Sequence, residues 1–151
     1  MSASTTATSA KIRFLLALLL GALFVYAGIS KLLDPAQFFT DIQNYDIIPW
    51  QPATVVLAFY LPWLEIICGV AVVAKPLRAG ALMILTTMLL LFTASLALAW
   101  ARGLNISCGC FGGASDHPRY LLWISRDVGL LIVAMVLTFA EWTSWKTPRC
   151  K

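Results

Sequence analysis

Two cysteines separated by one glycine, Cys108 and Cys110, are the residues of this chain best suited to chemistry. A disulfide requires its two Cα atoms to lie about 4.4–6.8 Å apart, so a bridge between neighbours this close needs a turn, which Gly109 permits. Such a bond would be strained, and strained, exposed disulfides exchange more readily. Because it closes a very short loop, it adds little stability through chain entropy. The spacing therefore favours a redox-active pair, with Phe111 and Gly112 as supporting loop residues.

Two other roles stay open for this pair. Together with His117, Cys108 and Cys110 offer three soft or borderline metal ligands, although a fourth ligand is not evident. The pair could also form a structural bond in a protein without catalytic activity. The remaining cysteines lie in different settings. Cys68 falls within an apolar run, where cysteine is usually a small packing residue, and Cys150, near the end of the chain, is given no role.

The composition identifies the environment that must position the cysteines. The chain has 151 residues, of which 60% are hydrophobic and 12% charged, and its mean hydropathy is +0.84. An average soluble domain is roughly 45–50% apolar and about 25% charged. So few charges cannot cover a water-soluble surface, and the composition also excludes disordered, collagen-like and disulfide-stapled secreted proteins. An integral membrane protein remains.

Four apolar runs are long enough to cross a bilayer, which takes about 20 residues per helix. The runs are continuous rather than alternating, which favours helices over strands. The first run also resembles a signal peptide, but it lacks a convincing cleavage site and is too long, so we expect it to be retained. The sequence therefore predicts an all-α, four-transmembrane-helix bundle. Its expected parts are a disordered tail at 1–10, a membrane domain at 11–145 with spans at about 12–33, 53–74, 79–101 and 120–140, and a tail at 146–151.

The distribution of lysine and arginine predicts the orientation of these spans. Four spans place both termini on one side, together with Lys11, Arg13, Lys75, Arg78, Lys146, Arg149 and Lys151, whereas the other side holds only Lys31, Arg102 and Arg119. By the positive-inside rule the termini face the cytoplasm of a bacterial inner membrane. The loops at 31–52 and 102–119, including the Cys-Gly-Cys pair, then face the periplasm, where disulfides persist. The positive net charge thus reports orientation, and we expect no nucleic-acid partner.

A short amphipathic helix is expected in the first outer loop. Asp34 is a suitable N-cap, Pro35 suits the first helical position, and Gln37 stands at the capping-box position. Apolar and polar residues then separate onto different faces, with Phe38, Phe39, Ile42 and Tyr45 on the first and Gln37, Asp41 and Asn44 elsewhere. Such a helix either lies on the outer leaflet or plugs the end of the bundle.

Charges inside the predicted spans form the second candidate site. Glu65 falls in the second span, and Arg126 and Asp127 fall in the fourth. Charged residues in a membrane usually face the bundle interior and pair, so the simplest interpretation is an internal ion pair that fixes helix packing. The functional alternative is a proton or quinone site beneath the cysteine loop. Tyr26 and Ser30, one turn apart on the first span, could add hydrogen bonds there.

Three further residues bear on the first span. Lys31, at its outer end, is expected to snorkel toward the interface. Ala17 and Gly21 form a small-x-x-x-small pair that could pack helices within one chain or between chains, so the oligomeric state is left open.

With these motifs assembled, the chain resembles the MauE/DoxX group of small four-helix membrane proteins, and specifically its MauE branch. The resemblance covers nearly the whole chain after the N-terminal tail. It rests on the stretch Tyr26–Lys31 followed by Asp34 and Pro35, on Leu61–Glu65 with Gly69, on Asn105–Gly112, and on Arg126 with Asp127.

The resemblance implies a redox-associated inner-membrane protein. MauE is linked to maturation of methylamine dehydrogenase, whose small subunit is rich in disulfides, and DoxX-like relatives include a subunit of a thiosulfate:quinone oxidoreductase. The leading hypothesis is a thiol–disulfide oxidoreductase in which Cys108 and Cys110 exchange electrons with a periplasmic, thioredoxin-fold partner. A membrane quinone is the one cofactor considered. The alternatives are a non-enzymatic assembly factor or subunit of a quinone-linked oxidoreductase complex, and a metal-handling protein.

Overall fold

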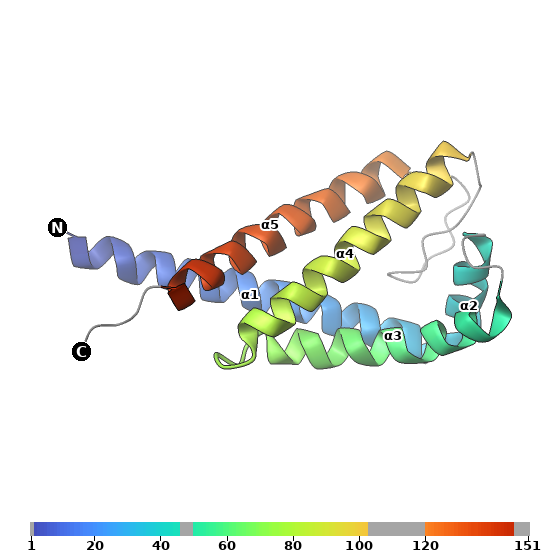
Figure 1. The fold of residues 1–151 in the computed structure, drawn as a ribbon, viewed down its shortest axis with the longest axis horizontal. Helices are drawn as coiled ribbons and strands as arrows, with labels where there is room; N and C mark the ends of the chain where they lie inside the picture. The colour runs from blue at the N-terminus through green and yellow to red at the C-terminus, as the bar shows by residue number, and fades with distance from the viewer. Residues whose placement is uncertain (1, 46–49, 103–119, 147–151) are drawn as a thin grey trace.

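The computed structural model describes residues 2–45, 50–102 and 120–146, and these residues form five helices. In chain order they are α1 (Ser2–Leu33), α2 (Pro35–Asn44), α3 (Gln51–Ala71), α4 (Arg78–Ala101) and α5 (Tyr120–Lys146) (Figure 1). Three of them, α1, α3 and α4, contain apolar stretches of 24, 21 and 24 residues that are long enough to cross a membrane. The all-α class is confirmed. The predicted count of four spans is not, since α5 does not belong to this apolar set.

The helix bounds differ from the predicted ones at two places. Residues 2–10, for which the sequence predicts a disordered tail, are drawn as the first turns of α1, and its apolar stretch begins at Ala10. Neither glycine nor proline interrupts these residues, so nothing ends the helix there. The second difference is at the C-terminal end of α3. This helix ends at Ala71, before the predicted bound at 74, and the chain then turns through 72–77. Pro76 lies in this turn, as expected of a residue that cannot continue a helix.

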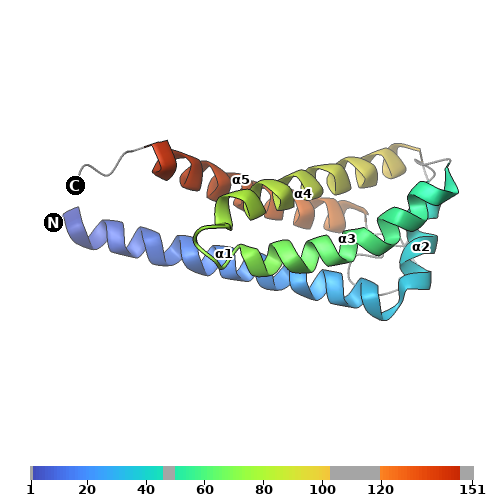
Figure 2. The ribbon, with the colours of Figure 1, turned by 60° about the horizontal axis from the view of Figure 1, so that its bottom comes forward.

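The helix predicted in the first outer loop is present as α2, with its predicted cap. The Asp34 carboxylate accepts a hydrogen bond of 3.0 Å from the Gln37 backbone N–H, and Pro35 occupies the first helical position. The Gln37 side chain donates to Asp41 at 3.0 Å instead of turning back to the cap. Asp41, expected on the polar face, is only 3% exposed, alongside the buried Phe38. α2 lies crosswise at the ends of α1 and α3 and packs on both, so it is closer to a plug than to a leaflet-bound helix (Figures 1 and 2).

The long helices associate as two pairs, α1 with α3 and α4 with α5. The pairs lie close together where the α3–α4 turn connects them and diverge toward the end that carries α2 (Figure 1). We call the end with the turn at 72–77 the narrow end, and the end with α2 the wide end. α4 ends and α5 begins at the wide end (Figure 1). The segment 103–119 therefore leaves and rejoins the described chain at the wide end.

Glycines allow α1 and α3 to pack backbone against backbone. A Cβ atom on Gly21 would overlap the Gly69 carbonyl oxygen, and one on Gly28 would lie 2.7 Å from the Pro62 carbonyl oxygen, closer than real Cβ contacts. Ala17, one turn before Gly21, is fully buried as well. The small-x-x-x-small pair of the sequence therefore packs helices within one chain, as close approach of membrane helices requires.

The narrow end is a packed apolar core with one central cation. Cys68 is buried in this core, as predicted for a packing residue, among Leu20, Val72, Leu82 and Leu85. Arg78 caps the end of α3 by donating to the carbonyl oxygens of Val72 at 2.9 Å and Val73 at 3.2 Å. Its guanidinium also lies 3.5 Å from the Glu141 carboxylate of α5 and 5.5 Å from the centroid of the Phe14 ring of α1. One side chain thus connects four helices.

Candidate functional site

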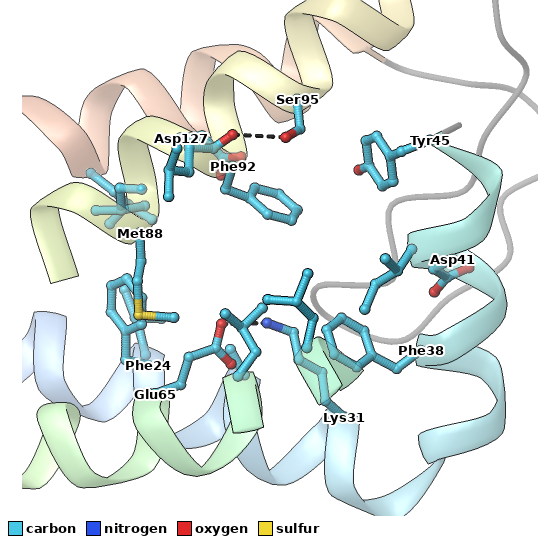
Figure 3. A pocket seen from close by; sticks show the side chains of 18 of the residues that line it. Phe24, Lys31, Phe38, Asp41, Tyr45, Glu65, Met88, Phe92, Ser95 and Asp127 are labelled. Carbon is cyan, nitrogen blue, oxygen red and sulfur yellow. Dashed lines mark hydrogen bonds and ion pairs between the residues drawn. The ribbon is translucent and has the colours of Figure 1, made fainter. Parts of the chain in front are cut away.

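A cavity of about 310 Å³ lies between the two helix pairs, and side chains from all five helices line it (Figure 3). Its walls are mainly apolar and include one aromatic or leucine side chain from each helix, namely Phe24, Phe38, Leu61, Phe92 and Leu130. Against these walls stand five acidic or basic side chains, Lys31, Asp41, Glu65, Arg126 and Asp127. A cavity with apolar walls and a few convergent polar groups is the usual form of a ligand site.

One wall carries a buried ion pair between α1 and α3. The Lys31 ammonium donates to Glu65 Oε1, and the two residues are only 3% and 6% exposed. The same ammonium lies 5.0 Å from the centroid of the Phe38 ring on α2. The prediction that Lys31 snorkels is therefore wrong. The lysine turns inward because a carboxylate at the same depth offers it a partner in a medium of low dielectric constant.

The facing wall carries a second pair, on α5. The Arg126 guanidinium donates to Asp127 Oδ1 through Nε at 3.1 Å and through Nη2 at 3.0 Å, and Asp127 is 3% exposed. The sequence predicts one internal ion pair, whereas the described residues place two around this cavity. Glu65 and Asp127 stand on opposite sides of the cavity (Figure 3).

Three carboxylate oxygens around the cavity have no hydrogen-bond partner among the described residues. They belong to Glu65, Asp127 and Asp41, one oxygen from each, and all three are buried. A buried acceptor without a partner costs about 1–3 kcal/mol, and more when it is charged. The cavity thus presents three acceptor oxygens whose hydrogen-bonding capacity the described part of the chain does not use.

Asp41 differs from the other two acids because it lies on α2, outside the long apolar helices. Burial raises the pKa of its carboxyl above the ordinary value of 3.8. The hydrogen bond from Gln37 opposes this shift, and the negative charge of Asp34 adds to it. Burial thus favours the protonated form of Asp41, which can donate a hydrogen bond.

Two of the predicted polar residues take no part in the cavity. Tyr26 is 57% exposed on α1 and does not belong to its lining. The Ser30 hydroxyl donates to the Ala27 carbonyl oxygen of its own helix at 2.9 Å. The remaining candidates of the sequence lie outside the described residues, and these are Cys108, Gly109, Cys110, Phe111, Gly112, His117 and Cys150. Within the described ranges, no group of three or more His, Cys, Asp or Glu side chains is suited to a metal ion.

Lys31 and Asp41 are the site residues that sequence reasoning missed, although helical periodicity contained a signal for each. Lys31 follows Phe24 and Ala27 at steps of three and four, which places it on the buried face of α1. Asp41 stands three residues after Phe38 and four before Tyr45, so it falls within the apolar stripe of α2. The charge of each side chain predicts an interfacial or polar setting, whereas its position in the helical repeat predicts the buried face.

Comparison with known proteins identifies the family to which this chain belongs. A family model described as "Methylamine utilisation protein MauE" matches residues 9–140. The chain belongs to the MauE family. The match begins just before the apolar stretch of α1 and ends within α5, so it includes α2, α3 and α4, most of α1 and α5, and every residue that lines the cavity.

Curated relatives carry the same family name. The chain is 33% identical over 123 residues to the methylamine utilization protein MauE of Paracoccus denitrificans, covering 81% of this chain and 66% of the relative. It is 33% identical over 119 residues to the MauE protein of Methylorubrum extorquens, covering 78% of this chain and 63% of that protein. The chain therefore spans slightly less than two thirds of the length of these relatives. No solved structure matches it.

Proposed function

We propose that this chain is an inner-membrane accessory protein of methylamine utilisation. It carries out thiol–disulfide exchange with a periplasmic partner through Cys108 and Cys110. Family membership supports the link to methylamine utilisation. The position of the ends of α4 and α5 supports the redox part of the proposal. α4 and α5 flank the segment that contains both cysteines, and they meet it at the wide end, where the cavity and its buried charges lie (Figure 1). A disulfide-rich enzyme such as methylamine dehydrogenase is the maturation target that we propose.

In the proposed topology α5 is the fourth membrane span. Its 27 residues extend about 40 Å, which exceeds the hydrocarbon thickness of about 30 Å. Arg78 contacts both Phe14 of α1 and Glu141 of α5, so the α3–α4 turn shares the narrow end with the N-terminal part of α1 and the C-terminal part of α5. By the positive-inside rule this end is cytoplasmic, and the wide end with the cysteine segment is periplasmic.

The exchange itself is an ordinary thiol–disulfide reaction. The thiolate of one cysteine attacks a sulfur of the partner's disulfide, forms a mixed disulfide and expels the partner's other sulfur as a thiolate. The second cysteine attacks that mixed disulfide, which leaves a Cys108–Cys110 disulfide and a dithiol in the partner. The partner gains two electrons and two protons, and the reverse reaction oxidises it. A thioredoxin-fold protein is the proposed partner. A membrane hydroquinone is proposed to restore the pair: it gives two electrons and two protons to the Cys108–Cys110 disulfide and is itself oxidised to the quinone. In the reverse direction the quinone takes two electrons and two protons from the dithiol.

Capture of the mixed disulfide tests this function. Full-length Cys108→Ala and Cys110→Ala variants are produced in the membrane of the host cell, free thiols are blocked with acid and alkylating reagent, and captured proteins are identified by mass spectrometry. We expect one variant to hold a periplasmic protein through a bond that reductant cleaves, whereas the matched Cys150→Ala control behaves as wild type. If neither variant captures a partner and both keep full function, thiol exchange is excluded.

The topology has an independent test. A membrane-impermeant thiol reagent added to intact spheroplasts should label reduced Cys108 or Cys110 and spare Cys150. Labelling of Cys150 alone would invert the proposed orientation.

A further inference from the structure

The cavity contains more hydrogen-bond acceptors than the described residues satisfy. Glu65 and Asp127 are each more than nine-tenths buried, each uses one carboxylate oxygen in an ion pair, and each keeps the other oxygen without a partner among the described residues. The two side chains face the same space from opposite walls (Figure 3). A ligand that donates hydrogen bonds from two sides would satisfy both oxygens and remove the cost of burying them unpaired.

The balance of charge selects a neutral ligand. The Lys31–Glu65 pair and the Arg126–Asp127 pair each sum to zero. A cation or anion placed between Glu65 and Asp127 would therefore meet charges that are already paired, and an uncompensated charge in a largely apolar cavity is expensive.

The walls select a flat, ring-sized group. Four aromatic side chains, Phe24, Phe38, Tyr45 and Phe92, line the cavity, and aromatic rings stack well against one another. Its volume of about 310 Å³ lies at the small end of the usual range for ligand pockets, about 300–1,000 Å³. This space suits a substituted ring rather than a whole lipid.

The cavity also has an opening that suits a long apolar tail. Leu57 of α3 and Leu91 of α4 belong to its lining, yet they are 36% and 66% exposed. The lining therefore continues to the surface between α3 and α4, two helices apolar enough to lie in a bilayer. A tail leaving through this opening enters lipid and not water.

We propose that the cavity binds the ring of a membrane hydroquinone, whose hydroxyls donate to Glu65 and Asp127 while its tail leaves between α3 and α4. The biological use of this binding rests on the proposed function, in which a hydroquinone restores the cysteine pair. The binding itself requires neither cysteine.

Equilibrium binding to the full-length protein in phosphatidylcholine nanodiscs tests the inference. The ligands are a hydroquinone with a ten-carbon tail kept under argon, the corresponding quinone, the same hydroquinone without its tail, and a ten-carbon primary ammonium. We expect the tailed hydroquinone to bind at least tenfold more tightly than the quinone, which has no hydroxyl to donate, and than the tail-less ring, which gains nothing from the bilayer. Equal binding of hydroquinone and quinone, or tighter binding of the ammonium, overturns the proposal. Equally tight binding of the tail-less ring overturns the assignment to a membrane-borne ligand.

Two matched variants on α1 test whether the ligand binds in the cavity. Ala27 is buried in the lining of the cavity, whereas Ala22 of the same helix is exposed and outside it. We expect Ala27→Leu to weaken hydroquinone binding at least tenfold by filling the cavity, and Ala22→Leu to leave it unchanged. Equal affinity of both variants and the wild type overturns the location.

A third variant keeps the test decisive if Ala27→Leu fails to fold. Glu65→Gln preserves the size of the side chain but places an amide donor where a carboxylate oxygen accepted. We expect the preference for hydroquinone over quinone to fall below threefold, and an unchanged preference overturns the role of Glu65. Hydroquinone binding should persist in the Cys108→Ser/Cys110→Ser double variant, so a failure of thiol exchange and a failure of this site are read from separate experiments.

Discussion

The two ends of the molecule bury charge in different ways. At the narrow end Arg78 is buried, but it donates to two backbone carbonyls and pairs with Glu141, so its charge is well satisfied. At the wide end Glu65 and Asp127 each keep a buried oxygen without a partner among the described residues, and both border an open space. A buried charge that is satisfied holds helices together. A buried acceptor left without a partner among the described residues, next to a cavity, calls for an explanation, and the ligand proposed for the cavity supplies one.

The largest effect is expected from breaking the ion pair of the wide end. Glu65→Ala leaves the buried Lys31 ammonium without its carboxylate, which should lower the free energy of unfolding by about 3–5 kcal/mol. The Lys31→Met/Glu65→Leu double variant should regain more than half of that loss, because an apolar pair of similar size needs no partner. Denaturant unfolding in mixed micelles measures both values. Strictly additive losses would show that the two residues do not interact.

The next largest effect is expected at the narrow end. Arg78→Ala removes the cap of α3 and the link to α5, and should cost about 2–3 kcal/mol, as for hydrogen bonds to a charged group. Lys75, exposed in the same turn, supplies the control, and Lys75→Ala should change stability by less than about 0.5 kcal/mol. Thermal melting in detergent compares the two variants. Hydroquinone affinity should be the same in folded Arg78→Ala as in wild type. A weaker affinity in this variant would contradict the separate roles of the two ends.

A smaller effect is expected where α1 and α3 touch. Gly21→Ala forces apart backbones that are already in contact, and should cost about 1–2 kcal/mol. Gly129 of α5 has no atom within 4 Å of its would-be Cβ, so Gly129→Ala should be neutral or slightly stabilising. The same melting assay measures this difference, and equal behaviour of the two variants would contradict the close packing of α1 on α3.

The smallest effect is a dependence on pH at the wide end. Burial raises the pKa of Asp41 in the folded protein, so the unfolded chain releases this proton at lower pH. The stabilisation from Asp41 is complete below its ordinary pKa of 3.8 and is lost as the pH rises through the higher folded value. Asp41→Asn, which cannot ionise, should flatten the pH profile of stability in that window. Melting temperatures measured from acid to neutral pH test this, and identical profiles would show that the α2 carboxyl does not titrate differently on folding.

Much of this fold follows from local rules. Continuous apolar runs predict α1, α3 and α4, and the Asp34-Pro35 cap predicts α2, because span length and capping depend only on neighbouring residues. The distribution of lysine and arginine between the two ends can also be read from the sequence, because it does not depend on how the helices pack. The small-residue spacing of Ala17 and Gly21 further predicts close helix packing, but not that Gly69 is the partner.

The pairing of charges could not be predicted in the same way. Whether Lys31 snorkels or turns inward depends on whether a carboxylate lies at the same depth on the neighbouring helix. That depth is set by the contact of Gly21 with Gly69, which fixes the register of α1 against α3 and brings Lys31 to Glu65. Asp41 is similar, because its burial follows from how α2 docks and not from its own sequence.

The redox state of Cys108 and Cys110 in living cells tests most directly whether the wide end is the working end. Acid quenching, alkylation of free thiols and a gel shift give the ratio of disulfide to dithiol in the wild type, in Ala27→Leu and in the matched Ala22→Leu, at equal protein levels. If a hydroquinone bound in the cavity restores the pair, the ratio changes at least threefold in Ala27→Leu and stays at the wild-type value in Ala22→Leu. The same ratio in all three proteins would contradict any connection between the cavity and the cysteines.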